Sequence, residues 1–174
     1  MASQKRLKRG INGSNPLYLN ANLIYSESLN FIEKENWISK IKSGGTLTKL
    51  NKEGYNLVTS VLTRMEVVQR LNREKGLSVE KARKIYLSIL DYHKILEMID
   101  THNHISLTAA MLEKVMRSNL DLKDALHLSV AKSLDIPLCT HDKKVRGNYS
   151  QHEEKKSYYE KVFKPEELIK PKNK

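Results

Sequence analysis

Hydrophobic positions along the chain fall into short apolar runs separated by longer stretches in which apolar residues recur at helical spacing. The runs predict strands at residues 17–19, 56–59, 96–99, 136–140 and 162–163, the last at a sheet edge. The helical spacing predicts helices at residues 22–42, 60–75, 78–90, 106–118 and 121–134. Strands that alternate with helices are typical of a three-layer α/β/α fold, with a central, mostly parallel sheet of four to five strands.

Local signals mark several of the helix ends. Ser60 and Ser78 stand where each could cap the helix that follows, and Gly76 ends the first of these two helices. The stretch 46–52 is ambiguous and is compatible with a short helix ended by Gly54. In the helix that begins at Ser78, Val79 is expected to share the apolar face with the residues that follow.

The size and composition of the chain fit one soluble domain. It has 174 residues, of which 39% are hydrophobic and 29% are charged. We divide it into a flexible basic arm at 1–15, a folded domain at 16–168 and a basic tail at 169–174. No apolar run approaches the roughly 20 residues that span a bilayer. The basic start is followed by a polar stretch instead of the apolar stretch of a secretory signal, so we predict a cytoplasmic protein without a membrane association.

The net charge of +11 is concentrated at the two ends of the chain. Residues 1–10 contribute +4, and residues 155–174, with seven Lys and three Glu, contribute another +4. Basic arms of this kind attract polyanions such as RNA without reading their sequence. A solvated tail that only aids solubility would have the same composition, and composition leaves both interpretations open.

The chain has a single cysteine, Cys139, inside one of the predicted strands. A single cysteine excludes an intrachain disulfide and a cysteine-rich zinc site. We expect a buried strand residue there and not a nucleophile.

Polar residues follow several of the predicted strands, where ligands bind in open α/β sheets. Glu66, Asp124 and Asp142 come from distant parts of the sequence, and we expect them to converge at this edge of the sheet. Clustered carboxylates repel one another unless a cation neutralises them, and ligands made only of oxygen suit Mg²⁺ or Mn²⁺. Such a site can activate water and stabilise the charge that builds on a phosphodiester.

Each acid also has a purely structural interpretation. Glu66 could pair with Arg70 one helical turn later. Asp121 and Asp124 could stabilise a helix N-terminus, and Asp142 could end a strand in an Asx turn. Their joint placement after the strands favours the shared site.

Five segments then resemble the motifs of PIN-domain nucleases. They are 18–22 (Tyr-Leu-Asn-Ala-Asn), 59–66 (Thr-Ser-Val-Leu-Thr-Arg-Met-Glu), 124–128 (Asp-Ala-Leu-His-Leu), 138–143 (Leu-Cys-Thr-His-Asp-Lys) and 162–168 (Val-Phe-Lys-Pro-Glu-Glu-Leu). The resemblance covers roughly residues 17–168, and the size is similar to that of VapC-type toxins. It implies a PIN-like fold, a Mg²⁺ or Mn²⁺ cofactor and hydrolysis of single-stranded RNA or RNA loops. It also implies a homodimer and a toxin that is silenced by a small antitoxin protein.

The resemblance assigns roles to individual residues. The catalytic, metal-binding set is Asn20, Glu66, Asp124 and Asp142. The supporting residues are Asn22, Ser60, Asp121 and Thr140, with Asp121 as a reserve ligand. Candidates for contact with the RNA backbone are Lys143, Lys144 and Arg146, for which a solvated loop is an equal alternative. His127, three residues after Asp124, is expected to be a packing residue beside the site.

Asn20 departs from the pattern, because the family normally has Asp at this position. An amide removes one negative charge from the metal site, so we expect weaker metal binding and slower hydrolysis. Two explanations stay open: an engineered or attenuated nuclease, or a natural, catalytically degenerate PIN module that binds RNA or a protein partner without cleavage. The three retained acids favour the first. The same chemistry would also serve a DNA nuclease.

Overall fold

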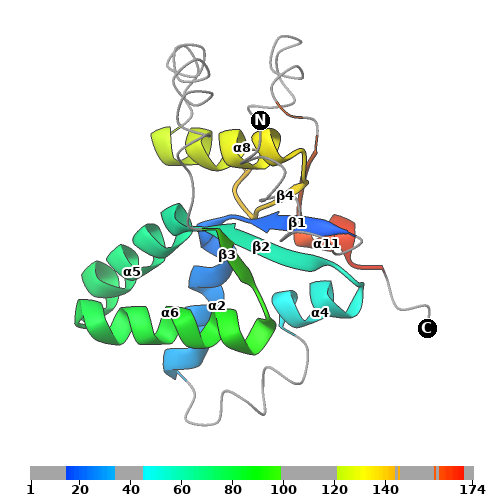
Figure 1. Ribbon diagram of the computed structural model, residues 1–174. Coiled ribbons are helices and arrows are strands. Elements are labelled where there is room, and N and C mark those ends of the chain that lie inside the picture. Colours follow the sequence, from blue (N-terminus) through cyan, green and yellow to red (C-terminus); the bar gives the residue numbers. More distant parts are fainter. Residues whose placement is uncertain are drawn as a thin grey trace.

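The computed structural model describes residues 15–33, 45–98, 121–143, 145, 159 and 161–170 (Figure 1). Several predictions lie outside the described residues. These are the helix at 106–118, the second half of the helix predicted at 22–42, most of both basic ends, Lys144 and Arg146.

Five strands form one sheet within the described residues. They are β1 (Pro16–Leu19), β2 (Asn56–Ser60), β3 (Leu96–Met98), β4 (Leu138–Cys139) and β5 (Val162–Phe163). The strand order is β3-β2-β1-β4-β5, and every neighbouring pair is parallel. The predicted parallel sheet is therefore confirmed, with β1 at its centre and β5 at one edge.

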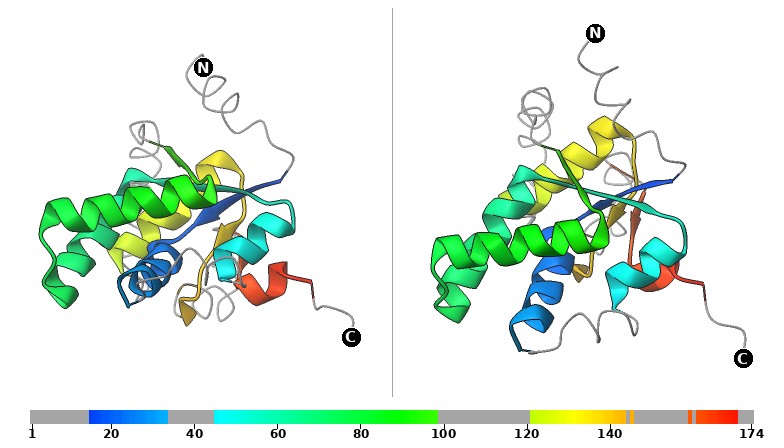
Figure 2. Two further views of the ribbon diagram at one scale, coloured as in Figure 1. Left: turned by 90° about the horizontal axis from the view of Figure 1, so that it is seen from below. Right: turned by 60° about the horizontal axis from the view of Figure 1, so that its bottom comes forward.

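Helices cover both faces of the sheet (Figures 1 and 2). They are α2 (Ala21–Glu33), α4 (Thr46–Lys52), α5 (Val61–Lys75), α6 (Val79–His93), α8 (Leu122–Leu134) and the short α11 (Pro165–Leu168). Alternate residues of a strand point to opposite faces, so β1 serves two cores. Leu17 and Leu19 pack with α2, α4, α5 and α6, whereas Tyr18 packs with α8. The three-layer α/β/α architecture predicted from the sequence is confirmed.

The predicted helix boundaries hold at most positions. The Ser78 side chain accepts a hydrogen bond from the Lys81 N–H, and Gly76 ends α5 with a φ of 65° that favours glycine. Ser60 occupies the cap position of α5, but its hydroxyl makes no capping bond. The expectation for Val79 is wrong, since 60% of this residue is exposed. It is the first residue of α6, at the projecting end where α5 turns into α6 (Figure 1).

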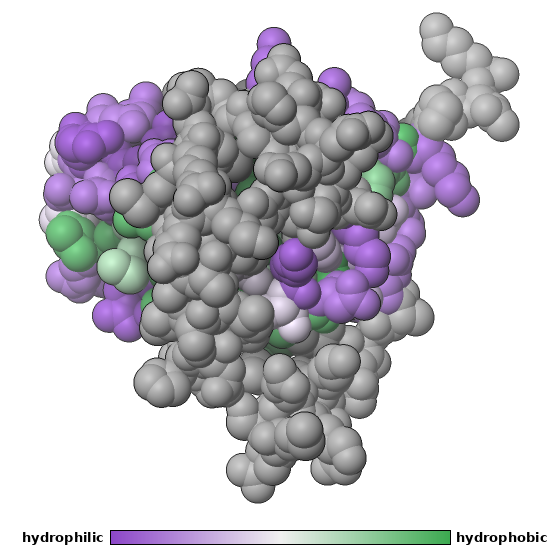
Figure 3. All heavy atoms as spheres, turned by 90° about the horizontal axis from the view of Figure 1, so that it is seen from above, coloured by the Kyte–Doolittle hydropathy of each residue, from purple (hydrophilic) through white to green (hydrophobic). Residues whose placement is uncertain are grey.

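Few large hydrophobic side chains reach the described surface. Seen from the side of α8, the coloured residues in Figure 3 are mostly hydrophilic, with small hydrophobic patches between them. Cys139 is fully buried in β4, as predicted, and burial raises the pKa of its thiol to about 12. Among the described helices, none combines the length and the apolar character that a bilayer crossing needs.

Candidate active site

The carboxyl ends of β1, β2 and β4 meet at one edge of the sheet. Asn20 directly follows β1 and is 4% exposed, and its backbone N–H donates to the Cys139 carbonyl at 3.1 Å. Ser60 is the last residue of β2, and Thr140 directly follows β4. Both are fully buried, so the parallel topology alone brings three of the predicted polar residues to one place.

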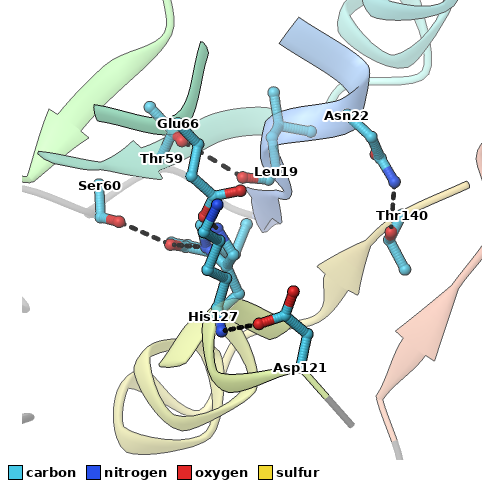
Figure 4. Close-up of polar contacts among 10 residues, drawn as sticks. Leu19, Asn22, Thr59, Ser60, Glu66, Asp121, His127 and Thr140 are labelled. Atoms are coloured by element: carbon cyan, nitrogen blue, oxygen red, sulfur yellow. Dashed lines mark hydrogen bonds and ion pairs between the residues drawn. The ribbon is translucent and has the colours of Figure 1, made fainter. Parts of the chain in front are cut away.

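A hydroxyl–amide pair joins the first turn of α2 to the segment after β4. Asn22 Nδ2 donates to Thr140 Oγ1 at 3.0 Å (Figure 4). The Asp142 N–H donates to the same oxygen at 3.0 Å. The Thr140 hydroxyl thus holds the backbone of Asp142. Asn22 Oδ1 is buried and has no hydrogen-bond partner within the described residues, which is unusual for an amide oxygen.

Glu66 faces α8 from the middle of α5. Its Oε1 lies 2.8 Å from His127 Nε2, and 19% of its side chain is exposed. The alternative pairing with Arg70 does not occur, because Arg70 Nε donates to Glu74 at 3.1 Å and its guanidinium stacks on the Tyr25 ring at 3.8 Å. Glu66 is therefore free of the helix-surface role that the sequence also allowed.

His127 is more than the packing residue that the sequence predicted. It is fully buried, as expected, but both ring nitrogens are engaged: Nδ1 lies 2.8 Å from the Tyr18 hydroxyl, and Nε2 faces Glu66. Tyr18 in turn lies 2.7 Å from Ser60 Oγ (Figure 4). The Ser60 hydroxyl, which belongs to a predicted supporting residue, thus contacts Tyr18. The available signal was a tyrosine in a strand buried on both faces, whose hydroxyl needs a partner.

Asp124 is half-buried in the first turn of α8, within the electric field of the other acids. Burial, together with the charges of Asp142, Asp121 and Glu66, raises the pKa of its carboxyl to about 6, whereas His127 opposes this shift. The charges of predicted acids from three separate segments thus raise the pKa of one carboxyl.

Two of these acids also make the structural contacts that the sequence allowed. Asp121 is exposed and caps α8, with its carboxylate accepting from the Lys123 N–H at 3.2 Å. Asp142 Oδ1 accepts from the Val145 N–H at 3.4 Å in the turn after β4. Lys143 lies beside this turn and is exposed.

The donor set matches the chemistry of Mg²⁺ or Mn²⁺. It consists of carboxylate oxygens and the Asn20 amide oxygen, and a cation would relieve the mutual repulsion of the carboxylates. The unpartnered Oδ1 of the supporting residue Asn22 is a further buried oxygen beside this set. In the part of the chain that the structure describes, no three acidic, histidine or cysteine side chains stand close enough to hold an ion without rearrangement. Glu66, Asp124 and Asp142 would therefore have to close around the ion.

A comparison with known sequence families identifies the fold independently. Residues 19–148 match the sequence family described as the PIN domain. No curated protein sequence matches the chain. Two solved structures each cover 86% of this chain and are themselves covered to 97%: a toxin-antitoxin complex from Klebsiella pneumoniae, with 13% identity and a TM-score of 0.47, and FitAcB from Neisseria gonorrhoeae, with 17% identity and a TM-score of 0.45.

Proposed function

Because the chain belongs to the PIN-domain family, whose members are typically metal-dependent nucleases, we propose that it is a Mg²⁺- or Mn²⁺-dependent endoribonuclease of the toxin type. One observation carries the proposal. The family match spans residues 19–148 and so includes all four candidate ligands, Asn20, Glu66, Asp124 and Asp142.

The chain's own residues would prepare the site in distinct ways. Asp124, Asp142 and Glu66 would hold the cation, with Asn20 as a neutral fourth ligand. When bound, the cation would activate water and stabilise the charge that builds on the phosphodiester. The Thr140 hydroxyl fixes the start of the turn that carries Asp142. Lys143 would contact an RNA phosphate.

The amide of Asn20 sets the expected level of activity. A carboxylate at this position would add a charge–charge attraction to the cation that, at an effective dielectric near 20, is on the order of several kcal/mol before desolvation. The protein with Asn20 should therefore bind the metal weakly and cleave slowly.

The test restores the carboxylate. We expect Asn20→Asp to bind Mn²⁺ more tightly and to cleave single-stranded RNA much faster than the parent chain, in proportion to added Mg²⁺ or Mn²⁺. The double variant Asn20→Asp with Glu66→Gln is the matched control and should lose the gain. A restored protein, purified without any inhibitor, that binds no Mn²⁺ and leaves RNA intact would refute the nuclease proposal.

A second candidate function is a PIN module that binds RNA or a protein without cutting. Asn20 favours it, together with the open arrangement of the acids in the described residues. Equal RNA binding by the parent and Asn20→Asp, with no cleavage by either, would support this second candidate. The encoded residue at position 20 of the native gene would separate an engineered replacement from a natural one.

The partners belong to the same proposal. From the family resemblance we propose a homodimer and a small antitoxin protein that silences the nuclease. Light scattering of the purified chain tests the dimer. A short reading frame for a small DNA-binding protein next to the gene would support the antitoxin, and the product of that frame can be tested for binding and inhibition.

A further inference from the structure

A chain of three hydrogen bonds crosses the interior beside the candidate site. Ser60 Oγ lies 2.7 Å from the Tyr18 hydroxyl, which lies 2.8 Å from His127 Nδ1, and His127 Nε2 lies 2.8 Å from Glu66 Oε1 (Figure 4). The four residues come from β2, β1, α8 and α5, so these hydrogen bonds link two neighbouring strands of the sheet to two helices.

When the His127 ring is neutral, the carboxylate at the end of these hydrogen bonds sets the direction of each of them. A carboxylate only accepts, so the proton of His127 lies on Nε2 and is donated to Glu66. Nδ1 then accepts from the Tyr18 hydroxyl, and the Tyr18 oxygen accepts from Ser60. Burial raises the pKa of the Tyr18 hydroxyl, which keeps it protonated as a donor.

Burial makes this arrangement rigid. Tyr18, Ser60 and His127 are all fully buried, whereas 19% of the Glu66 side chain is exposed. Only the carboxylate end of the chain therefore reaches the surface, at the edge where Asp124 and Asp142 lie. Buried hydrogen bonds to a charged group are strong, and losing one leaves an unpaired polar group inside the protein.

We propose that His127 is a positioning residue for metal binding. It holds Glu66 through Oε1 so that the second oxygen faces the cation, and Tyr18 fixes the imidazole ring in the tautomer and rotation that this requires. The inference rests on the proposed function, because it assigns Glu66 a cation to bind.

Two substitutions of His127 distinguish the role of Nε2 from the role of Nδ1. In the Asn20→Asp protein, His127→Gln places an amide nitrogen near the position of Nε2 and keeps a donor for Glu66. His127→Asn keeps a polar group near Nδ1 for Tyr18 and leaves Glu66 without its donor. Both remove the ring and should lower the melting temperature by similar amounts, so stability alone cannot separate them.

The measurements are titration with Mn²⁺ alone, by calorimetry, and the metal concentration that half-saturates RNA cleavage. We expect His127→Asn to weaken Mn²⁺ binding about 10- to 100-fold, the range for losing the partner of a metal ligand. His127→Gln should restore most of that loss. Tyr18→Phe, which keeps the ring and removes only the hydroxyl, should weaken Mn²⁺ binding about 2- to 10-fold and serves if the His127 variants do not fold.

His93 provides a matched control within the same chain. It is also a buried histidine beside a buried glutamate, with Nε2 3.4 Å from Glu27 Oε1, but it ends α6 next to the Asn51 side chain of α4 and lies outside the site. His93→Asn should lower the melting temperature and leave the affinity for Mn²⁺ unchanged.

The outcomes separate this inference from the proposed function. If the Asn20→Asp protein binds Mn²⁺ and cleaves RNA, and His127→Asn and His127→Gln bind Mn²⁺ equally well, the positioning role is refuted and the nuclease stands. If the Asn20→Asp protein neither binds Mn²⁺ nor cleaves, both are refuted. A loss of affinity in His93→Asn as large as in His127→Asn would also refute the specific role of His127.

Discussion

The Asn22 amide donates a hydrogen bond of 3.0 Å to the Thr140 hydroxyl and joins two segments that lie 118 positions apart in the sequence. Asn22 is in the first turn of α2, and Thr140 directly follows β4. The same hydroxyl oxygen accepts from the backbone of Asp142. One side-chain oxygen therefore sets the spacing between the start of α2, next to Asn20, and the turn that carries the candidate metal ligand Asp142.

We predict that Thr140→Val destabilises the protein by about 1–3 kcal/mol. Valine has nearly the same shape but cannot accept the two hydrogen bonds, and the Asn22 amide would be left buried without a partner. Chemical denaturation in urea, monitored by circular dichroism, gives the free energy of unfolding. Thr140→Ser keeps the hydroxyl and is the control. If Thr140→Val and Thr140→Ser lower the free energy of unfolding equally, the loss comes from the methyl group, and the hydroxyl does not organise these segments.

The raised pKa of Asp124 predicts a pH dependence of stability in the metal-free protein. The pKa of its carboxyl is about 6 when folded against an ordinary value of 3.8, so the folded protein holds this proton more tightly. The contribution of Asp124 to the free energy of unfolding therefore falls as the pH rises from about 4 through 6.

Asp124→Asn should remove this contribution. Relative to the parent, the variant should gain about 1–2 kcal/mol of stability between pH 4 and pH 7, a figure reduced for solvent screening of the half-buried carboxylate. Urea denaturation at both pH values, with EDTA present, measures the difference. A constant difference between the two proteins across this range would contradict the raised pKa.

Much of the fold was readable from the sequence because its signals are local. The apolar runs around Leu17 and Val58 predicted buried parallel strands, and Gly76 and Ser78 marked the turn between α5 and α6. The positions of Asn20 and Thr140 followed from topology, since carboxyl ends of neighbouring parallel strands meet at one edge.

The side-chain partners were less predictable, because they depend on contacts across elements. Nothing within α5 indicates that Glu66 faces His127, and Arg70 has a glutamate one helical turn away on each side, Glu66 and Glu74. The same holds for Ser60. Its local position predicts a helix cap, but its hydroxyl makes a hydrogen bond with Tyr18 of the neighbouring strand. Such pairings require the packing of α8 against the sheet, which a periodic pattern in one helix does not encode.

The buried position of Cys139 predicts an unreactive thiol. It lies fully buried in β4 with a pKa raised to about 12, so little thiolate forms at neutral pH and reagents cannot reach it. We expect Ellman's reagent at pH 8 to label the native protein only as fast as the protein unfolds, and to label it fully and at once in urea. Rapid labelling of the native protein would show that β4 opens locally.

A bidentate ion pair between Arg64 and Glu97 connects α5 to the edge strand β3 and should contribute measurably to stability. The side chains are only 24% and 12% exposed, so removing one charge leaves the other poorly solvated. We predict that Glu97→Gln lowers the free energy of unfolding by about 1–3 kcal/mol. Glu80→Gln breaks the exposed pair with Lys84 and is the control, with an expected cost below about 0.5 kcal/mol. If urea denaturation shows that Glu97→Gln and Glu80→Gln lower the free energy of unfolding equally, the β3 pair is as well solvated as the surface pair.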